Sequence, residues 1–589
     1  MRLIASRLSE VRLAAEDGFT MLMALATLVV VMGLSAAAFA AINADLPLTS
    51  NDSFQKDAYA AAQAGIQRYQ YALDQNSEFW TQCAPASSTW INQAGALPLK
   101  STTVPGSTTE KYAVELLPAA GQATYTQCST ANPVASMIQA TGIGAGSIRI
   151  RVTGYAGNVK RTIVANLREQ SFLDYEYFTN FETSDPYLQV AEAFQGNSAD
   201  TTIEPPDLCG SNPGSCGSNY SAALSGAQAQ CAQYRYAGRY TTPFYADSYT
   251  DSSGHTHTGS YSCDQIQFAP GDKINGPFHS NDQVLVCPNG TGPVFGRTSA
   301  DSIEFGNSTG WVNAGGCSGN PVIKGTIPST ISILKPPPSN ASLKTITAAP
   351  YLYTGTTCIK LQVGSILVAQ PGVGANASKP SCFSSGLTWS STSYPTNGVL
   401  YVANGACSLT YDVESPSYTG NTGCGTVYVA GVDDTPLTIA AENDIVIDGN
   451  LTYNNSSSSM LGLIANNFIR VYHPVGTQPL TNNASVCTQS SSNATGSLSN
   501  LEIDAMLLSL QHSFVVDQYN CGASLSNLTV NGGIAQMFRG PVGTSGGTGY
   551  IKDYTYDDRL RYEEPPHFID PVQGSWRIQR QTECDTTAC

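Results

Sequence analysis

Four carboxylates in the second half of the chain are candidates for acid-base chemistry. Asp444, Asp448, Glu502 and Asp504 have the side chains that could cleave a glycosidic bond, a reaction that needs paired carboxyl groups. Asp448 precedes a Gly-Asn turn, and Asp444 lies where a strand is expected to turn a corner. Structural roles therefore account for them without catalysis.

Two His-Ser pairs place a potential base beside a potential nucleophile. They are His279-Ser280 and His512-Ser513. The sequence has no Gly-x-Ser-x-Gly elbow, and neighbours in sequence do not make a catalytic triad. We therefore predict that the protein is not an enzyme and has no catalytic residue.

A metal site is not expected either. His255 and His257 could contact a metal ion, but they lie in a Gly/Ser/Thr-rich stretch without further ligands nearby. His473 most simply ends a strand before a proline. Cys209 and Cys216 are too far apart for a C-x-x-C knuckle, and no cysteine pair has a suitably spaced histidine. The sequence thus predicts no metal and no cofactor.

The cysteines instead predict disulfides. All 16 lie from Cys83 onward, and their number is even. This usage is typical of a chain exported to an oxidising compartment. The pairing cannot be read from the sequence, although Cys584 and Cys589 could close a small terminal loop.

Length and composition indicate several domains rich in β structure. The chain has 589 residues, which is ample for more than one core. Charged residues make up only 12%, whereas Gly, Ser, Thr, Asn and Tyr are plentiful, as in strands joined by many turns. The net charge of −16 and the absence of a Lys/Arg-rich run argue against nucleic acid as a partner.

An uncharged run near the N-terminus must position everything that follows. It begins at Phe19 and continues to the first acid, Asp45. As a helix, a run of this length can cross a bilayer core. Arg2, Arg7 and Arg12 precede it and would hold the N-terminus on the cytoplasmic side.

Two processing signals overlap in this run and imply different proteins. Gly18 followed by Phe19-Thr20 resembles a type IV prepilin cleavage site, after which the apolar helix stays as the mature N-terminus and the protein stays anchored. Ala38-Phe39-Ala40 fits an ordinary secretory signal, and cleavage after Ala40 would release the protein. An uncleaved anchor is a third option. We favour the prepilin-like interpretation, because the next segment also fits it.

The resemblance to pilin-like proteins implies roles for individual residues. Prepilin peptidase would cut between Gly18 and Phe19, and the apolar helix would lie in the membrane and pack with other pilin-like subunits. Pilins of the filament shaft have Glu at the fifth mature position, where this chain has Met23, so the resemblance favours a minor or atypical pilin-like protein. The implied membrane and assembly residues are Phe19, Leu22, Met23, Leu25, Leu28 and Val31.

A pilin-like stalk follows in the pattern of residues 53–170. Residues 53–82 have apolar side chains at helical spacing, and Pro47 predicts a bend or break before them. Strands are expected at 111–117, 147–153 and 159–167, the last two as a hairpin across Ala156-Gly157-Asn158. A small antiparallel sheet on a long N-terminal helix is the pilin plan, so the resemblance covers roughly residues 16–170.

Residues 171–265 are interpreted as a connector and an insertion. The aromatic and acidic strip 171–185 could grip a sugar or a peptide, but we expect it to wedge two domains together. The part from 202 to 263 is rich in Cys, Gly, Tyr and Ser and predicts a disulfide-tied insertion with little regular structure.

Short apolar segments repeat through residues 266–535. Setting Ile439 on Leu463 aligns Asn443 with Asn467 and Ile445 with Ile469, an offset of 24 residues. Setting Leu463 on Leu508 aligns Ile469 with Phe514 and Val471 with Val516, an offset of 45. Such repeats predict a right-handed β-helix, with a β-sandwich as the alternative and a Pro-rich excursion near 335–395.

The second half also resembles a poorly characterised module of bacterial surface proteins with prepilin-like N-termini. The resemblance rests on the turn Gly276-Pro277-Phe278-His279, on residues 437–445 and on Gly462-Leu463-Ile464-Ala465. It implies an architecture and a location, and no catalytic activity. Residues 536–589 are predicted to cap the repeats.

These observations predict a mainly β chain with a transmembrane, pilin-like α-helix, a small antiparallel β domain and a large disulfide-stabilised β-helix. The expected function is structural or adhesive, in the cell envelope within or beside a type IV pilus or pseudopilus system, and surface glycans are possible ligands. The alternative is a secreted β-helix protein that binds or degrades polysaccharide. The predicted divisions are a leader over 1–18, a helix over 19–82, a pilin-like domain over 83–170, then 171–265, 266–535 and 536–589.

Overall fold

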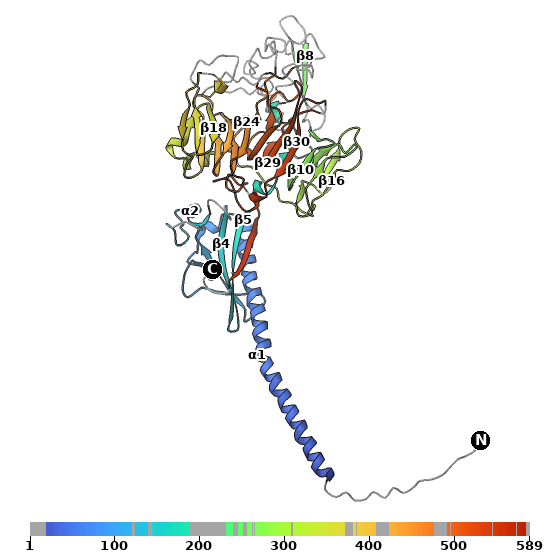
Figure 1. The fold of residues 1–589 in the computed structure, drawn as a ribbon, viewed down its shortest axis with the longest axis vertical. Helices are drawn as coiled ribbons and strands as arrows, with labels where there is room; N and C mark the ends of the chain where they lie inside the picture. Colours follow the sequence, from blue (N-terminus) through green and yellow to red (C-terminus); the bar gives the residue numbers. More distant parts are fainter. Residues whose placement is uncertain are drawn as a thin grey trace, which may run out of the picture.

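In the computed structural model the chain forms a long helical stalk that carries a small sheet and a broad distal domain (Figure 1). The strands among the described residues form sheets of six, twenty, three and two strands. The predicted mainly β fold class with an N-terminal helix is confirmed. The structure describes residues 19–119, 124–139, 144, 146–188, 231–239, 245–250, 256–261, 263, 265–307, 310–371, 381–383, 386–407, 423–475, 492–494, 496–544, 546–572 and 574–584.

Helix α1, Phe19–Gln75, is the longest element. The break predicted at Pro47 is wrong, because α1 runs through this residue and ends at Gln75, ahead of the 3-10 turn η1, Phe79–Gln82. One interior proline costs a helix about 3 kcal/mol, which the good helix formers on both sides and the docking of the second half offset. The predicted apolar spacing is confirmed, since one stripe of α1 is buried in the core of the small sheet, comprising Ala62, Ile66, Tyr69 and Leu73.

The six-stranded sheet packs on the second half of α1. Its order is β1-β3-β4-β5-β31, with β2 beside β3. The predicted hairpin is confirmed, because β4 and β5 pair antiparallel with Ile148 opposite Leu167. The strands are β1 Ile91–Gln93, β2 Thr102–Thr103, β3 Lys111–Leu117, β4 Ser147–Ala156, β5 Val159–Glu169 and β31 Trp576–Cys584.

Strand β31 corrects the predicted C-terminal cap over residues 536–589. It pairs antiparallel with β5, so that Trp576 lies opposite Glu169 and Cys584 opposite Thr162. Trp576 is buried in the same core as the docked half of α1. The chain therefore returns from the distal domain, and α1, the six-stranded sheet and its loops form what we call the stalk domain.

The distal domain consists mainly of parallel strands stacked in three ladders, and we call one turn of strands around them a rung. The first ladder is β17-β21-β23-β25-β27-β29-β6-β11-β14. The second is β18-β22-β24-β26-β28. The third is β29-β30-β10-β13-β16. A separate parallel sheet, β9-β12-β15, lies beside the rungs of β11 and β14.

These strands are short, apart from those that bend from one ladder into another. The first ladder comprises β6 Tyr177–Phe181, β11 Phe278–Ser280, β14 Ile303–Phe305, β17 Leu352–Thr354, β21 Val399–Ala403, β23 Leu437–Ala441, β25 Leu461–Ala465, β27 Leu501–Ser509 and β29 Ser524–Phe538. The others are β9 Gln267–Phe268, β10 Lys273–Asn275, β12 Val284–Val286, β13 Val294–Phe295, β15 Trp311–Asn313, β16 Val322–Ile323, β18 Thr357–Gln362, β22 Val427–Asp433, β24 Ile445–Tyr453, β26 Ile469–Val471, β28 Phe514–Val516 and β30 Gly549–Tyr556.

Most of the predicted stacking registers are observed. Ile439 lies opposite Leu463 and Ile445 opposite Ile469, as predicted for an offset of 24. At the next step the second ladder keeps the predicted offset of 45, since Ile469 lies opposite Phe514.

One predicted register is wrong by one residue. Leu463 lies opposite Leu507 and not Leu508. Leu463 and Leu507 share the interior core, whereas Leu508 joins Ile464 in a core on the other face of the sheet. A shift by one residue would exchange these faces, so the extra residue is taken up at the corner between β27 and β28.

The order of the rungs in space differs from their order along the chain. From β6 the chain winds through β11 to β14 at one end of the stack, returns through residues 326–351, and then winds from β17 to β29 until it meets β6. Strand β30 likewise lies between β29 and β10. The first and last rungs of the chain are thus neighbours in the middle of the stack, with the green strands on one side of them and the yellow and orange strands on the other (Figure 1).

This winding corrects three predicted boundaries. Strand β6 belongs to the first ladder and not to a connector, and its Tyr177 and Phe178 are core residues. Strands β17 and β18 are rungs, so the excursion predicted at 335–395 is limited to the return segment and to an antiparallel extension of β18 by β19, Ser365–Ala369, and β20, Ser390–Thr392. Strand β30 lies inside the stack and does not cap its end.

The predicted disulfides are confirmed for the cysteines in the described part of the chain. Cys521 and Cys584 are also disulfide-bonded, and none of the described cysteines is free. The described pairs are Cys83–Cys128, Cys231–Cys263, Cys287–Cys317, Cys358–Cys382 and Cys407–Cys424.

Candidate functional site

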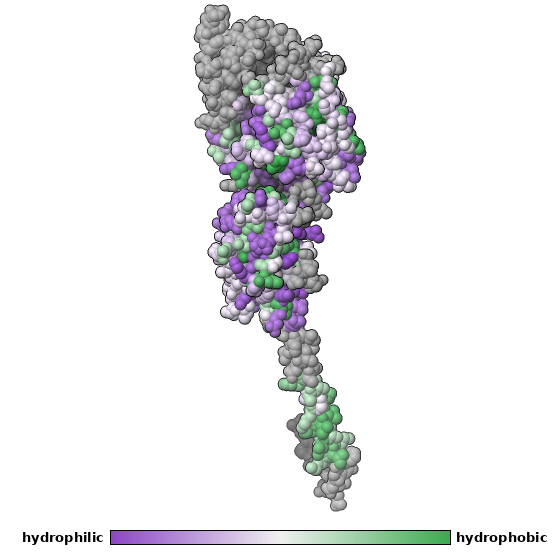
Figure 2. All heavy atoms as spheres, turned by 90° about the vertical axis from the view of Figure 1, so that its left-hand side faces the viewer, coloured by the Kyte–Doolittle hydropathy of each residue, from purple (hydrophilic) through white to green (hydrophobic). Residues whose placement is uncertain are grey.

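The first half of α1 projects away from the rest of the molecule with its apolar side chains exposed. Residues Met21–Phe39 have a mean hydropathy of 2.3, none of this span is buried, and by length and composition it can cross a membrane. Its helical length is ~28 Å, close to the thickness of a bilayer core. Figure 2 shows the span as a continuous apolar surface below the polar body. The predicted assembly residues Leu22, Met23, Leu25, Leu28 and Val31 are all more than half exposed.

The exposed span is apolar around its whole circumference, because consecutive positions such as Val29, Val30 and Val31 face different sides. A helix of this kind is not stable in water without an apolar environment or apolar partners. The hydroxyl of Thr27 donates to the carbonyl of Ala24 at 3.0 Å, so this polar group is satisfied within the helix. Gly18 lies outside the described residues, and Phe19 is the first residue of α1.

The second half of α1 is fixed to the sheet by a very close contact. A Cβ at Gly154 on β4 would lie 2.0 Å from the carbonyl oxygen of Ala58 and 2.4 Å from the amide of Ala62. A Cβ at Gly65 would likewise overlap Val152 and Tyr112. Glycine at these positions lets helix and strand backbones touch. One continuous helix therefore links an exposed apolar span to a rigid domain.

The four carboxylates weighed for catalysis have structural partners or lie apart. Asp444 accepts from the amide of Phe468 at 3.0 Å and pairs with Arg470 at 3.4 Å. Burial raises the pKa of Asp448 to about 7. The charged neighbour that acts on this carboxyl group is Lys360, and no described carboxylate pairs with it as a second catalytic group. Glu502 and Asp504 are brought together on β27, where both accept from the Asn531 amide, Asp504 at 2.8 Å and Glu502 at 3.4 Å.

His279 and Ser280 lie on strand β11, whereas His512 and Ser513 lie at the corner between β27 and β28, and both imidazoles have hydrogen-bond partners. Nδ1 of His279 is 2.7 Å from Glu304, and its Nε2 is 2.8 Å from Asn281. Nδ1 of His512 is 2.8 Å from Asp185, and the ring stacks on Phe468. The hydroxyl of Ser280 accepts from the amide of Asp282 at 3.1 Å. The hydrogen bonds of these side chains hold strand β11 and the corner between β27 and β28 to neighbouring segments.

His473 follows the end of β26, as predicted, and it is buried between two loops. Its Nδ1 lies 3.0 Å from the carbonyl of Asp517 and its Nε2 3.1 Å from the side chain of Asn493. His255 lies outside the described residues. Over the described part of the chain, no three His, Cys, Asp or Glu side chains converge as a metal ion would require.

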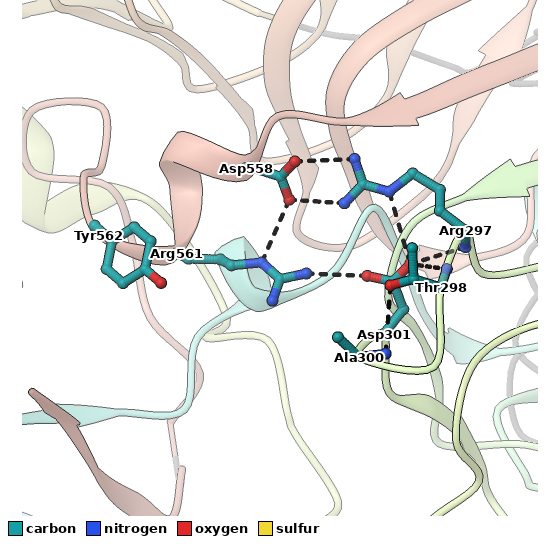
Figure 3. Close-up of a pocket in the computed structure, with 7 residues that line it drawn as sticks. All are labelled: Arg297, Thr298, Ala300, Asp301, Asp558, Arg561 and Tyr562. Carbon is teal, nitrogen blue, oxygen red and sulfur yellow. Dashed lines mark hydrogen bonds and ion pairs between the residues drawn. The ribbon is translucent and has the colours of Figure 1, made fainter.

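A shallow hollow of about 440 Å³ lies where the rung of β13 and β14 meets the turn η7, Asp558–Arg561 (Figure 3). Arg297 binds Asp558 through two hydrogen bonds of 2.7 and 3.0 Å. Arg561 contacts Asp301 at 3.0 Å and Asp558 at 3.5 Å, which closes a ring of alternating charges with Tyr562 at its edge. The two cations and two anions neutralise one another, so the ring joins η7 to the rung and offers no unpaired charge to a ligand.

A buried ionic cluster in the middle rungs has no counterpart in the sequence predictions. Arg539 pairs with Glu182 at 2.9 Å, lies 3.6 Å above the ring of Phe268 and is almost fully buried. Arg239 pairs with Asp282, and both side chains are fully buried. The partners are far apart in sequence, so no local pattern indicates them.

Comparison with known proteins gives little further guidance. No protein-family model matches the sequence, and no curated protein matches it. Among solved structures, the competence-associated pilin ComZ from Thermus thermophilus is similar at 12% identity and a TM-score of 0.22, over 90% of this chain and 97% of that chain. A likeness of this extent supports no inference about fold or function, so the assignment rests on the features of the chain itself.

Proposed function

We propose that the chain is a membrane-anchored, pilin-like cell-surface protein of a type IV pilus or pseudopilus-type system. The three ladders would form a disulfide-stabilised β-solenoid that serves as a structural or adhesive head outside the cytoplasm. The stalk domain would hold this head away from the membrane. Because position 23 is Met and not Glu, the protein would be a minor or atypical subunit.

The observation that carries this proposal is the division of α1 into two halves. The span from Met21 to Phe39 is entirely exposed and apolar, whereas the part from Ala58 to Leu73 is the core of the stalk domain. A single helix with these two surfaces is suited to bind lipid or other apolar helices at one end and to carry a folded domain at the other.

The resemblance of Gly18-Phe19 to a prepilin site supplies the processing step. Prepilin peptidase would remove residues 1–18 and leave Phe19 at the mature N-terminus. The disulfides fit an oxidising compartment. The head would bind a surface component such as a glycan and perform no catalysis.

Release after Ala40 is the competing hypothesis. The buried stripe of α1 begins at Ala58, so a chain cut after Ala40 retains every helix residue that packs on the sheet. This hypothesis predicts the same folded domains in the medium and none in the membrane.

A charge in the apolar span tests the assignment in cells. Leu28→Arg places a cation at the middle of the span at a cost of about 2.5–3.5 kcal/mol for insertion. We expect this variant to disappear from membranes and from sheared filaments. Tyr71→Arg is the matched control, because Tyr71 is 65% exposed on the docked half of the same helix, and it should stay in both fractions. Retention of Leu28→Arg in filaments would contradict the proposal.

A further inference from the structure

In the described part of the chain, two segments cross between the stalk and distal domains, and they cross side by side. The first leads from β5 through residues 170–176 to β6, and the second leads from β30 through residues 557–575 to β31. Strands β5 and β31 are neighbours in the stalk sheet. Strands β6 and β30 both pair with β29 in the distal domain. The crossings are therefore adjacent at both ends.

The first crossing is short and held in one conformation. Ser171 caps the turn η2, Phe172–Asp174, by accepting from the amide of Leu173 at 3.3 Å, and Asp174 accepts in return from the amide of Ser171 at 2.9 Å. Phe172 and Leu173 are fully buried. The hydroxyl of Tyr556, at the end of β30, donates to the carbonyl of Leu173 at 2.7 Å. The end of strand β30 thus holds the first crossing.

The two crossings are also bonded to each other. The guanidinium of Arg168 on β5 donates to the carbonyl of Leu560 at 3.1 Å and pairs with Glu564 at 3.4 Å. Both side chains of this contact are more than nine-tenths buried. The amide of Gln170 donates to the carbonyl of Ser575 at 2.8 Å. These contacts link the two crossing segments to each other between the stalk and distal domains.

Further contacts brace the second crossing on both sides. The amide of Gly144, in a loop of the stalk, donates to the carbonyl of Tyr562 at 2.7 Å. The amide of Val572 donates to the carbonyl of Lys335 at 2.9 Å, and Lys335 belongs to the return segment of the distal domain. The second crossing is therefore fixed to both bodies along its length.

A single flexible crossing lets two domains rotate about it, which is the usual expectation for domains in one chain. Two crossings that are anchored in paired strands of the stalk domain and in strands that pair with successive parts of β29 remove that rotation. Strand β6 has parallel partners on both sides, β29 and β11, so a pull along β6 meets two rows of hydrogen bonds at once.

We propose that the double crossing is a rigid, load-sharing joint. It fixes the direction of the distal domain relative to α1, and it delivers tension from the anchored helix to the middle of the stack and not to an open end. The source of that tension rests on the proposed function, whereas the rigidity does not. The stalk domain and the distal domain then move as one rigid body.

Distances between spin labels on the full-length chain in detergent test this joint. Ketone-bearing residues for spin labelling replace Tyr71 on the stalk and Val363 on the distal domain, so the native disulfides are not disturbed, and both sites are well exposed. A second pair, Val363 and Ile551, lies within the distal domain and reports its integrity. A recognition sequence for a specific protease, inserted after Val572, allows the second crossing to be cut after folding.

We expect the 71–363 distance distribution to be as narrow as the 363–551 distribution in the uncut chain. Cutting should broaden the 71–363 distribution and leave the 363–551 distribution unchanged. A broad 71–363 distribution before cutting would overturn the rigid joint. An unchanged narrow distribution after cutting would overturn the role of the second crossing. Either failure leaves the membrane and filament tests of the proposed function untouched.

Discussion

Ile534 on β29 lies directly opposite Tyr177 on β6. The longest strand of the distal domain, which comes late in the sequence, thus pairs with the strand at which the chain enters this domain. This contact joins the two halves of the distal domain into one stack. It also places both connections to the stalk in the middle of that stack, where no open strand edge is exposed to partners. The stability of the middle rungs therefore determines how firmly the head is held.

The buried ionic cluster of the middle rungs should be a major determinant of stability. Arg539→Met removes the partner of Glu182 and leaves a buried carboxylate without its cation. Breaking a buried pair in this way costs about 3–5 kcal/mol. We expect a lower midpoint in denaturant unfolding, whereas Arg580→Met, at an exposed position, should unfold like the unmodified chain. Equal midpoints for both variants would show that the cluster is dispensable.

The contact between helix α1 and strand β4 should not tolerate a methyl group. Gly154→Ala forces a Cβ into the backbone of α1 at Ala58, so the helix must move off the sheet. Overpacking of this kind costs about 1–3 kcal/mol or more. Hydrogen exchange should then rise in residues 54–75 of α1. Gly315→Ala is the control, since nothing lies within 4 Å of its added Cβ, and unchanged exchange in both variants would refute the close approach.

The joint should lose stability as the pH rises. Burial raises the pKa of Glu564 to about 8 from an ordinary 4.5, although Arg168 opposes the shift, and burial also raises the pKa of the neighbouring Asp570. Two carboxyl groups thus share one cation, and one of them keeps its proton at neutral pH. The folded chain binds more protons than the unfolded chain between about pH 4.5 and 8, so the free energy of unfolding falls as the pH increases through this window.

Glu564→Gln should flatten this pH dependence. One such group contributes at most about 1.4 kcal/mol per pH unit to the free energy of unfolding. Chemical unfolding at a series of pH values measures the slope. Glu563→Gln, at the adjacent and less buried position, should keep the slope of the unmodified chain. Identical slopes for all three proteins would exclude Glu564 as the source.

Both ring nitrogens of His279 face hydrogen-bond acceptors. Leu334 fixes the side-chain amide of Asn281, because the Leu334 amide donates to Oδ1 at 3.1 Å and its carbonyl accepts from Nδ2. Nε2 of His279 therefore faces an acceptor, and Nδ1 faces the carboxylate of Glu304. Burial alone would raise the pKa of Glu304, but hydrogen bonds from His279, Ser302 and Tyr175 hold it below its ordinary value.

Nitrogen-15 NMR of the imidazole rings tests this assignment. Nε2 of His279 should carry a proton because it faces the Asn281 oxygen, and its signal is identified by its loss in His279→Gln. His567 is the internal reference, because burial lowers its pKa and its ring should be neutral. An unprotonated Nε2 on His279 would contradict the hydrogen-bond assignment.

The sequence predicts the repeating parts of the fold well. It predicts poorly the strand pairings between segments that are far apart in the chain. The 24-residue register was predictable because the apolar pattern repeats and because Asn467 donates to Asn443 at 2.8 Å at equivalent corners. The exposed apolar span Met21–Phe39 was predictable from composition alone. The sequence places Tyr177 in a connector, because the strands that pair with it lie about 100 and 360 residues away. No local sequence pattern indicates such distant partners. The pairing of β31 with β5 was missed for the same reason.

The mature N-terminus is the most direct test of the central claim that this is an anchored, pilin-like protein. Mass spectrometry of the chain from membrane, sheared-filament and medium fractions gives it in one experiment. We predict a chain that begins at Phe19 and is found in membranes or filaments. A chain that begins at Ala41 and is found in the medium would contradict it and would direct attention to the distal domain as a secreted protein.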